Sequence, residues 1–348
     1  MTETIASERI PLPDDASAIF DYYEERGWTD GLPIIPPTEE RVRQMLGGTR
    51  LAPDKSLGQI PPSNSDVLVE KVAANAVMAG CRPEYMPVVL SALEALLHER
   101  CNLYGYQATT YPKAPLIIVN GPVRQRIKLN SGYGVFGPGW RANATIGRAV
   151  RLCMLNIGGG TPGVMDKDTH GHPGKYTMCI GENEENSPWE PLHVERGFKK
   201  EDSCVTVLLT EGPHNINDHD NTTGKGVLGV CADTMCTLGM NIIFRHNSDP
   251  VLMLGPEHAA NCAQDGFSKQ DVKKFIWNKA RLPHYKLKTG GMYSFRTWPA
   301  WYESLDDHDM IPLCPDENQI IVIVAGGPGK QSACIPPLTR SVTRRIEE

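Results

Sequence analysis

The sequence predicts an α/β protein made of two similar halves with mainly parallel strands, preceded by an N-terminal helical arm. Two observations support this fold class. Four short apolar runs, of a kind typical of strands buried on both faces, occupy residues 115–120, 204–210, 250–255 and 319–325. Each run is followed by Gly-Pro, at once or after one residue, and segments with helical spacing of apolar residues lie between the runs.

Residues 1–50 form the predicted arm. The stretch 14–27, DDASAIFDYYEERG, predicts an acid-capped amphipathic helix that ends at Gly27, and Thr38 predicts the N-cap of a second helix. We expect this Pro-rich arm to pack on the body or to reach a second subunit. Together with the acidic pI of about 6.0, the arm favours a homo-oligomer.

The first half is predicted to span 51–213 and the second 214–348. In the first half we expect helices at 65–79, 86–99 and 142–155, and a long polar insertion at 160–200 before the strand at 204–210. The second half has a helical pattern at 268–282 between its two strands.

The two halves share a local pattern. GPVRQRIKLNSGY and GPEHAANCAQDGF, at 121–133 and 255–267, both consist of Gly-Pro, nine residues, Gly and an aromatic residue. Each follows a predicted strand and precedes a predicted helix. The pattern predicts an internal duplication with a pseudo-twofold axis.

Composition narrows the function. The net charge is −6, so a nucleic acid or an anionic membrane is not expected as the partner, because both need a concentrated basic face. No apolar run approaches the roughly 20 residues of a membrane span, and the first residues do not resemble a signal peptide. The ten cysteines include no Cys-x-x-Cys pair, which is typical of buried thiols in a reducing compartment. We expect a soluble, cytoplasmic protein.

The Gly-Pro turns indicate where a ligand would bind, because ligands of parallel sheets bind beyond the carboxyl ends of the strands. Polar residues follow all four of these turns, beginning with Arg124 after the first. His214 and His258 are the expected acid/base pair, and Glu257 lies in the first turn of a helix that would lower the pKa of the histidine. The expected substrate-binding residues in these turns are Asn215, Asp218 and Lys330.

A second substrate-binding group is predicted at FGPGWRANATIGRA, 136–149. Arg141 and Asn143 stand at the entry of a helix, where free backbone N–H groups and a guanidinium would bind a carboxylate or phosphate. Neither this stretch nor IVAGGPGKQS, 323–332, has Walker or Rossmann spacing.

The polar insertion THGHPGKYTMCIGENEENSPWEPLHVERG, 169–197, is expected to line the cleft, because long ordered loops in compact domains are usually functional. Lys175 would bind substrate and Glu182 would act as an acid or orient the base. The cofactor is unknown from the sequence, but a divalent metal fits one alternative, in which the ligands are His170, His172, His214 and His219.

Cys81 is the candidate reactive thiol. In AGCRPEY it stands at a break between two helices, beside Arg82, whose charge would favour the thiolate and could also bind substrate. The alternative is a small buried residue, with Arg82 paired to Glu84.

Five segments carry a family resemblance: GWTDGLPIIPPTEERVRQML, EKVAANAVMAGCRPEYMPVVL, NSGYGVFGPGWRANATIGRA, GKYTMCIGENEENSPWEPLHVERGF and GPHNINDHDN. Over roughly residues 20–285 the chain resembles an uncharacterised bacterial family that is associated with the Sec/Cys-Gly-Ser-Cys (UGSC) (seleno)protein family. The resemblance implies a thiol or selenol redox protein as partner, although this chain itself contains no Cys-Gly-Ser-Cys.

The sequence therefore predicts an enzyme that acts on a small anionic substrate by acid/base cleavage or addition at a carbon–heteroatom bond, a lyase-like reaction linked to thiol chemistry through Cys81 or a redox partner. Two alternatives stay open. One is a metal-dependent hydrolase that uses the histidine cluster. The other is a non-catalytic subunit of a redox complex.

Overall fold

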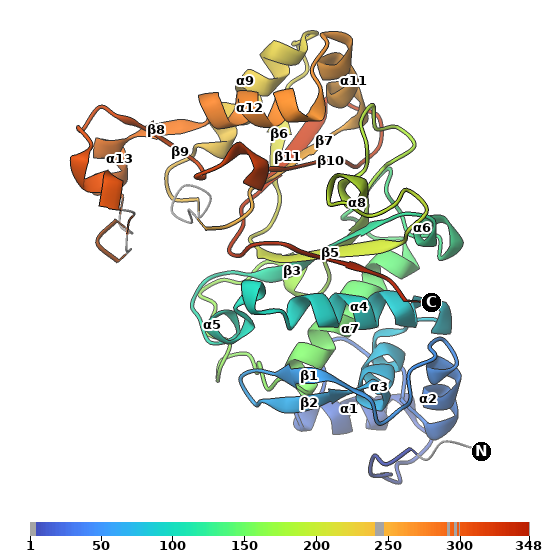
Figure 1. Cartoon of the computed structure of the whole chain (residues 1–348). Helices are drawn as coiled ribbons and strands as arrows, with labels where there is room; N and C mark the ends of the chain where they lie inside the picture. The colour runs from blue at the N-terminus through green and yellow to red at the C-terminus, as the bar shows by residue number, and fades with distance from the viewer. Residues whose placement is uncertain (1–4, 241–246, 291–292, 296–297, 299, 348) are drawn as a thin grey trace.

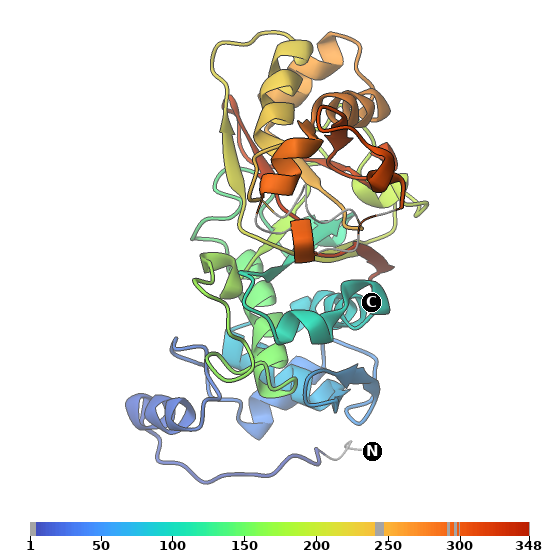
Figure 2. The ribbon, with the colours of Figure 1, turned by 90° about the vertical axis from the view of Figure 1, so that its left-hand side faces the viewer.

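The structure, a computed structural model, describes residues 5–240, 247–290, 293–295, 298 and 300–347. The chain folds into four layers, in which two mixed β-sheets pack face to face and helices cover both outer faces (Figure 1). The α/β class predicted from the sequence is confirmed. Figure 2 shows the same layers from the side, with the arm at one end.

The arm contains both helices expected in it, α1 (Ala16–Glu25) and α2 (Glu39–Leu46). Asp15 and Thr38 cap them by accepting hydrogen bonds from backbone N–H groups of the first turn. Helix α2 buries Val42 and Met45, whereas α1 buries no residue and extends away from the body (Figure 2). The homo-oligomer expected from the sequence stays a prediction.

The first sheet has the strand order β12-β5-β3-β4. Strands β3 and β5 are the predicted apolar runs, and they pair antiparallel over their whole length. The strands of this sheet are β3 (Ala114–Asn120), β4 (Cys179–Gly181), β5 (Cys204–Thr210) and β12 (Val342–Arg345).

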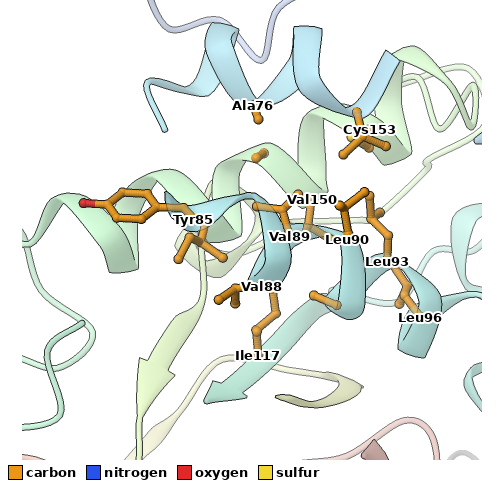
Figure 3. Packing of buried hydrophobic residues seen from close by; sticks show 14 of the residues in the cluster. Ala76, Tyr85, Val88, Val89, Leu90, Leu93, Leu96, Ile117, Val150 and Cys153 are labelled. Carbon is orange, nitrogen blue, oxygen red and sulfur yellow. The ribbon is translucent and has the colours of Figure 1, made fainter. Parts of the chain in front are cut away.

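Helices α4 and α7 cover the outer face of the first sheet, and α3 packs on these two helices. Figure 3 shows their packing, with Ala76 on α3, Val89 and Leu93 on α4, and Val150 on α7 directed toward one another. The helices of this half are α3 (Val69–Ala79), α4 (Met86–Leu96), α5 (Leu103–Gln107), α6 (Val123–Arg126), α7 (Arg141–Asn156) and α8 (Leu192–Glu195).

The helix predicted at 65–79 is shorter than expected. Its first four residues form strand β2 (Ser65–Leu68), which pairs antiparallel with β1 (Ser56–Ile60). The intervening Pro61-Pro62 and Asn64, at φ 55°, make the hairpin turn. This hairpin buries Ile60 and Val67 completely, so tertiary packing outweighs the helical spacing there.

The second sheet has the strand order β10-β7-β11-β6. It contains β6 (His214–Asn217), β7 (Val251–Leu254), β10 (Ile321–Val324) and β11 (Gln331–Ile335). Its outer face carries α9 (Gly224–Met235), α11 (Pro256–Gln264) and α12 (Lys269–Lys279). A small flanking hairpin and helix complete this half: β8 (Arg281–Pro283), α13 (His284–Thr289) and β9 (Met310–Pro312).

The expectation of mainly parallel strands is wrong. Among the described residues, two of the eight strand pairs are parallel, β3 with β4 and β7 with β10. Polar and apolar residues do not alternate in the apolar runs, because each sheet lies between a helical layer and the other sheet. Both faces of every central strand are therefore buried. Leu116 and Ile118 face the second sheet, whereas Ile117 faces the helices.

Candidate functional site

A cavity of about 700 Å³ lies between the arm and the polar insertion. Thr29, Asp30 and Gly31 of the arm form one wall, and Arg151 and Leu155 of α7 contribute another. The remaining lining residues come from the insertion and its approach: Pro162, Gly163, Asp166, Asp168, His170, Gly171, His172, Pro173, Lys175 and Tyr176. The insertion therefore lines a cavity, although not the one at the Gly-Pro turns, which no residue of 169–197 lines.

Ion pairs and hydrogen bonds hold the arm on α7. Arg148 binds both carboxylate oxygens of Asp30, with Nε–Oδ2 and Nη2–Oδ1 distances of 2.8 Å each. The buried Thr29 donates its hydroxyl to the carbonyl of Leu32 at 2.7 Å. Gly31, at φ 86°, lets the chain turn between these contacts. The sequence WTDGLP thus forms a fixed wall of the cavity.

Two lysines and two aspartates form a closed ring beneath this cavity. Lys113 Nζ lies 3.1 Å from Asp166 Oδ1 and 3.0 Å from Asp168 Oδ1, and Lys175 Nζ lies 2.5 and 2.6 Å from the Oδ2 atoms of the same carboxylates. Each carboxylate therefore bridges both ammonium groups. The side chains of Lys113 and Asp166 are each 1% exposed, so water hardly screens the attraction between their charges.

Arg151 adds a third cation to this ring. Its Nη2 lies 3.7 Å from Asp166 Oδ2, and its Nε donates to the carbonyl of Lys175 at 2.9 Å. Three cations thus face two carboxylates, which leaves one excess positive charge beside the cavity.

The pKa shifts fit this arrangement. Burial alone would raise the pKa of Asp166, but the hydrogen bond from Lys175 and the charge of Lys113 outweigh it and lower that pKa. Burial lowers the pKa of Lys113, although Asp166 and Asp168 oppose this shift. Asp166 is therefore ionised, and Lys113 loses its proton more readily than an ordinary lysine.

His172 provides an imidazole in the wall of the cavity. Its Nδ1 accepts a hydrogen bond from the backbone N–H of Gly174 at 3.2 Å, which caps the 3₁₀ turn Pro173–Lys175, and its ring lies beside Gly212. Burial is the main cause that lowers the pKa of His172. The ring is therefore neutral at pH 7. His170 also lines this cavity but is exposed.

A smaller cavity, of about 300 Å³, lies where strand ends of the second sheet meet the first half. Three of the four Gly-Pro turns reach it, through Pro213, Gly255 and Gly327–Gly329, and the ring of Tyr133 packs on Gly327. This convergence follows the sequence prediction. The chemical character of the cavity differs from the prediction, because the lining consists of apolar, amide and small residues. Asn215 is the one predicted site residue among them.

The predicted acid/base pair is not assembled there. His258 is completely buried, and both ring nitrogens are occupied: Nδ1 lies 2.8 Å from Ser332 Oγ and Nε2 lies 3.0 Å from the carbonyl of Asp218. It is a core histidine that joins α11 to β11. His214 and Glu257 are both exposed, and neither lines a described cavity.

The other predicted residues, in β6 and in the turns after β6 and β10, make hydrogen bonds within the protein. Both carboxylate oxygens of Asp218 accept hydrogen bonds from Asn221, and Lys330 donates to the carbonyl of His219 at 2.7 Å. Asn215 Nδ2 donates to Gln331 Oε1 at 2.7 Å. These contacts fix the loop after β6 and leave little free to bind a substrate.

Arg141 and Asn143 do not form the expected anion site. Arg141 is exposed and donates through Nε to the carbonyl of Gly80 at 3.0 Å. Asn143 is buried, and its side-chain amide bonds the backbone of Asn130 and the carbonyl of Cys179. Its hydrogen-bonding capacity is used to fix the loop before α7.

Cys81 is not an activated thiol. It is buried and its Sγ donates to the carbonyl of Thr145 at 3.3 Å, and burial raises its pKa to about 12. Arg82, expected to favour the thiolate, is exposed with its Nη1 at 3.8 Å from Glu84 Oε1. The small-buried-residue alternative therefore describes this position.

Among the described residues, no group of three His, Cys, Asp or Glu side chains is arranged to hold a metal ion. The four candidate histidines lie in two places. His170 and His172 line the larger cavity, whereas His214 and His219 belong to β6 and the loop after it. The structure thus does not bring together the ligand set of the metal-dependent alternative.

Glu182 lies outside the cavity, directly after β4 and beside the end of β3. It is completely buried, and its Oε2 accepts hydrogen bonds from Asn120 Nδ2 at 2.6 Å and from the backbone N–H of Leu192 at 2.8 Å. Its Oε1 has no hydrogen-bond partner among the described residues. Burial raises the pKa of Glu182. Its role is to join α8 to the first sheet.

We expect Glu182→Gln to change how stability depends on pH. Below the ordinary carboxyl pKa of 4.5, Glu182 is protonated in both folded and unfolded chains. As the pH rises through the raised folded pKa, the wild type loses stability because a buried carboxylate forms. The variant lacks this loss, so urea denaturation should show that its stability increases relative to that of the wild type as the pH rises above 4.5.

Glu185→Gln is the matched control, because the hydrogen bond from Arg124 outweighs the effect of burial and lowers the pKa of Glu185. This second variant should instead lose stability, relative to the wild type, above pH 4.5. Identical pH dependence of wild type and Glu182→Gln would contradict the raised pKa of Glu182.

Sequence reasoning missed Lys113, Asp166, Asp168, Arg151 and Asp30. A pattern was present: Asp166 and Asp168 alternate, as they would on one side of an extended segment, seven residues or more before Lys175. Lys113 directly precedes an apolar strand, which is an unusual place for a charge. Neither feature reveals its partner, because the two segments are 53 to 55 positions apart.

No helix in the part of the chain that the structure describes is long and apolar enough to cross a membrane. Comparisons with protein-family models, with curated proteins and with solved structures find no match to this chain.

Proposed function

We propose that this chain is an enzyme that binds a small carboxylate in the 700 Å³ cavity and catalyses acid/base cleavage or addition at a carbon–heteroatom bond. The observation that carries the proposal is the buried ring of Lys113, Asp166, Asp168 and Lys175 with Arg151 beside it. It leaves one uncompensated positive charge at a cavity that also contains a neutral imidazole.

Arg151 and Lys175 are the groups that would bind the carboxylate. Both line the cavity, and each is held by the ring, so little side-chain entropy is lost when the substrate binds. A guanidinium and an ammonium in a site of low dielectric attract an anion strongly. Asp166 and Asp168 orient the lysine without neutralising all the positive charge.

His172 and Lys175 would move the proton. The neutral imidazole of His172 can accept a proton from the carbon next to the bound carboxylate only at Nδ1, which must first give up its hydrogen bond from the Gly174 N–H. The ammonium of Lys175 can donate a proton to the departing oxygen, nitrogen or sulfur atom. The reverse sequence gives addition. Lys113, behind the two aspartates, would keep the ring positively charged while Lys175 donates.

A panel of small mono- and dicarboxylates, screened by thermal shift and calorimetry, tests this function. We expect at least one of them to bind, with affinity reduced about tenfold or more by Lys175→Met, which corresponds to the loss of one charge-assisted contact. Lys167→Met is the matched control, since Lys167 belongs to the same segment but is exposed and does not line the cavity.

Lys175→Arg keeps the charge and should retain part of the binding, which separates loss of a contact from loss of folding. Carboxylate binding that is equal in wild type and Lys175→Met would exclude the cavity as the substrate site.

A thiol or selenol redox protein remains the proposed partner, on the basis of the family resemblance. The ten cysteines of this chain are all buried, and burial raises the pKa of each. In this proposal the partner contributes the reactive thiol or selenol, and this chain contributes the carboxylate site.

We also propose that the two halves arose by internal duplication. Strand order supports this origin: from one edge, β4-β3-β5-β12 and β10-β7-β11-β6 both pair parallel, then antiparallel, then antiparallel. The two halves exchange a strand. In chain order β6 follows β5 of the first sheet but belongs to the second sheet, and β12 follows β11 of the second sheet but belongs to the first.

A further inference from the structure

Three arginines from distant segments line one groove on the first half. Arg100 lies in the short turn after α4, Arg196 follows α8, and Arg344 belongs to the edge strand β12. The groove has a volume of about 310 Å³ and is completed by His98, Phe198, Ser341, Val342 and Thr343. It shares no lining residue with the 700 Å³ cavity.

The charge of these arginines is hardly compensated. Arg196 Nη2 donates to Ser341 Oγ at 3.1 Å, while Asp249 Oδ2 lies 4.0 Å away. That carboxylate already pairs with Arg340 and accepts two hydrogen bonds from Ser341. In the described part of the chain, neither Arg100 nor Arg344 has a carboxylate oxygen within 4.0 Å of its guanidinium.

The neighbouring Arg345 shows the contrast. Its Nε lies 3.2 Å from Asp202 Oδ1, so an arginine on the same strand but outside the groove does have a partner. Three like charges around one groove repel one another, and this costs free energy in a chain whose overall charge is −6. A bound anion would remove that cost.

His98 adds a directed donor. Its Nδ1 accepts a hydrogen bond from the backbone N–H of Arg100 at 3.2 Å, which places the ring proton of the neutral form on Nε2. This assignment follows from the hydrogen bond. The groove thus combines three guanidinium forks with an imidazole N–H.

We propose that this groove binds the phosphate group of a small phosphorylated compound, a site separate from the proposed carboxylate site. The planar fork of arginine matches two phosphate oxygens at a time, and three forks offer more donors than the two oxygens of a carboxylate can accept. A phosphate monoester has three terminal oxygens and nearly two negative charges near pH 7. The groove is compact, which favours one phosphate group over an extended polyanion.

Calorimetric titration with inorganic phosphate and with glycerol 3-phosphate, at constant ionic strength, tests the site. Both probes should saturate the protein below about 10 mM, and acetate should bind at least about tenfold more weakly. The variant Arg100→Gln/Arg344→Gln should weaken phosphate binding about tenfold or more. Both side chains are exposed, so the variant should fold, which circular dichroism checks.

Arg345→Gln is the matched control and should bind phosphate like the wild type. Failure to saturate with either probe, equal binding to acetate, or undiminished binding by the double variant would each overturn the site. Co-sedimentation with vesicles that contain phosphatidic acid, without binding of the free phosphates, would assign the groove to a lipid headgroup and overturn the proposal as well. Lys175→Met should leave phosphate binding unchanged, so this result is independent of the proposed function.

Discussion

Asp166→Ala is expected to lower the free energy of unfolding by about 3–5 kcal/mol, because removing one partner of a buried ion pair leaves uncompensated charge in a low-dielectric site. Asp166 bridges Lys113 and Lys175 and lies near Arg151. Its removal leaves Asp168 as the one remaining carboxylate in the ring. Urea denaturation at pH 7, followed by circular dichroism, measures the change.

Glu39→Ala is the control for this variant. Glu39 also accepts from two cations, Arg9 and Arg43, but it is on the surface, so water replaces the lost partners and the stability loss should be far smaller. Equal losses in the two variants would show that the ring is not buried in solution.

The ring also predicts that the folded chain loses stability at acidic pH. The pKa of Asp166 is lower in the folded chain than its ordinary value of 3.8, so the stability it contributes is present above that value. It is lost as the pH falls through the folded pKa. Below about pH 4, the wild type should lose stability faster than Asp166→Ala.

His172→Gln is expected to reduce turnover of the carboxylate substrate by about 10²–10⁴-fold, the usual contribution of a general base. The glutamine keeps a side chain of similar length but cannot take up a proton. We expect kcat to fall much more than substrate affinity, because Arg151 and Lys175 remain to bind the carboxylate. Steady-state kinetics on the substrate found in the carboxylate screen provides the measurement.

The pH profile gives a second readout. Because burial lowers the pKa of His172 below its ordinary 6.5, kcat/KM of the wild type should fall only as the pH drops through a value lower than 6.5. His214→Gln is the control, since that histidine is exposed and lies outside the cavity. A loss of turnover in His214→Gln that matches or exceeds that in His172→Gln would restore the base expected from the sequence and reject the one proposed here.

Several features of the fold could be predicted from the sequence. The apolar runs at 115–120, 204–210, 250–255 and 319–325 do contain strands β3, β5, β7 and β10. A run of at most seven residues between turn residues is long enough for a buried strand but shorter than a typical helix. Local capping residues, Asp15 and Thr38, predicted the arm helices for an equally local reason.

Strand direction could not be predicted. The run at 204–210 has the same apolar pattern whether it pairs parallel or antiparallel with 114–120, because the pattern records only that both faces are covered. The second sheet, and not a second helical layer, covers the inner face. That arrangement depends on contacts between segments far apart in the chain.

The sequence by itself determined that residues 169–197 are a polar insertion before the strand at 204–210 and that Lys175 and His172 stand in this segment. Only the tertiary structure decided what they do, since it brings Lys113 from the start of β3 and Arg151 from α7 to the same two aspartates. The physical reason is the range of the interactions. Apolar periodicity and capping act over a few neighbouring residues, whereas the partner of a buried charge is chosen by which segments the folded core places within about 4 Å of it.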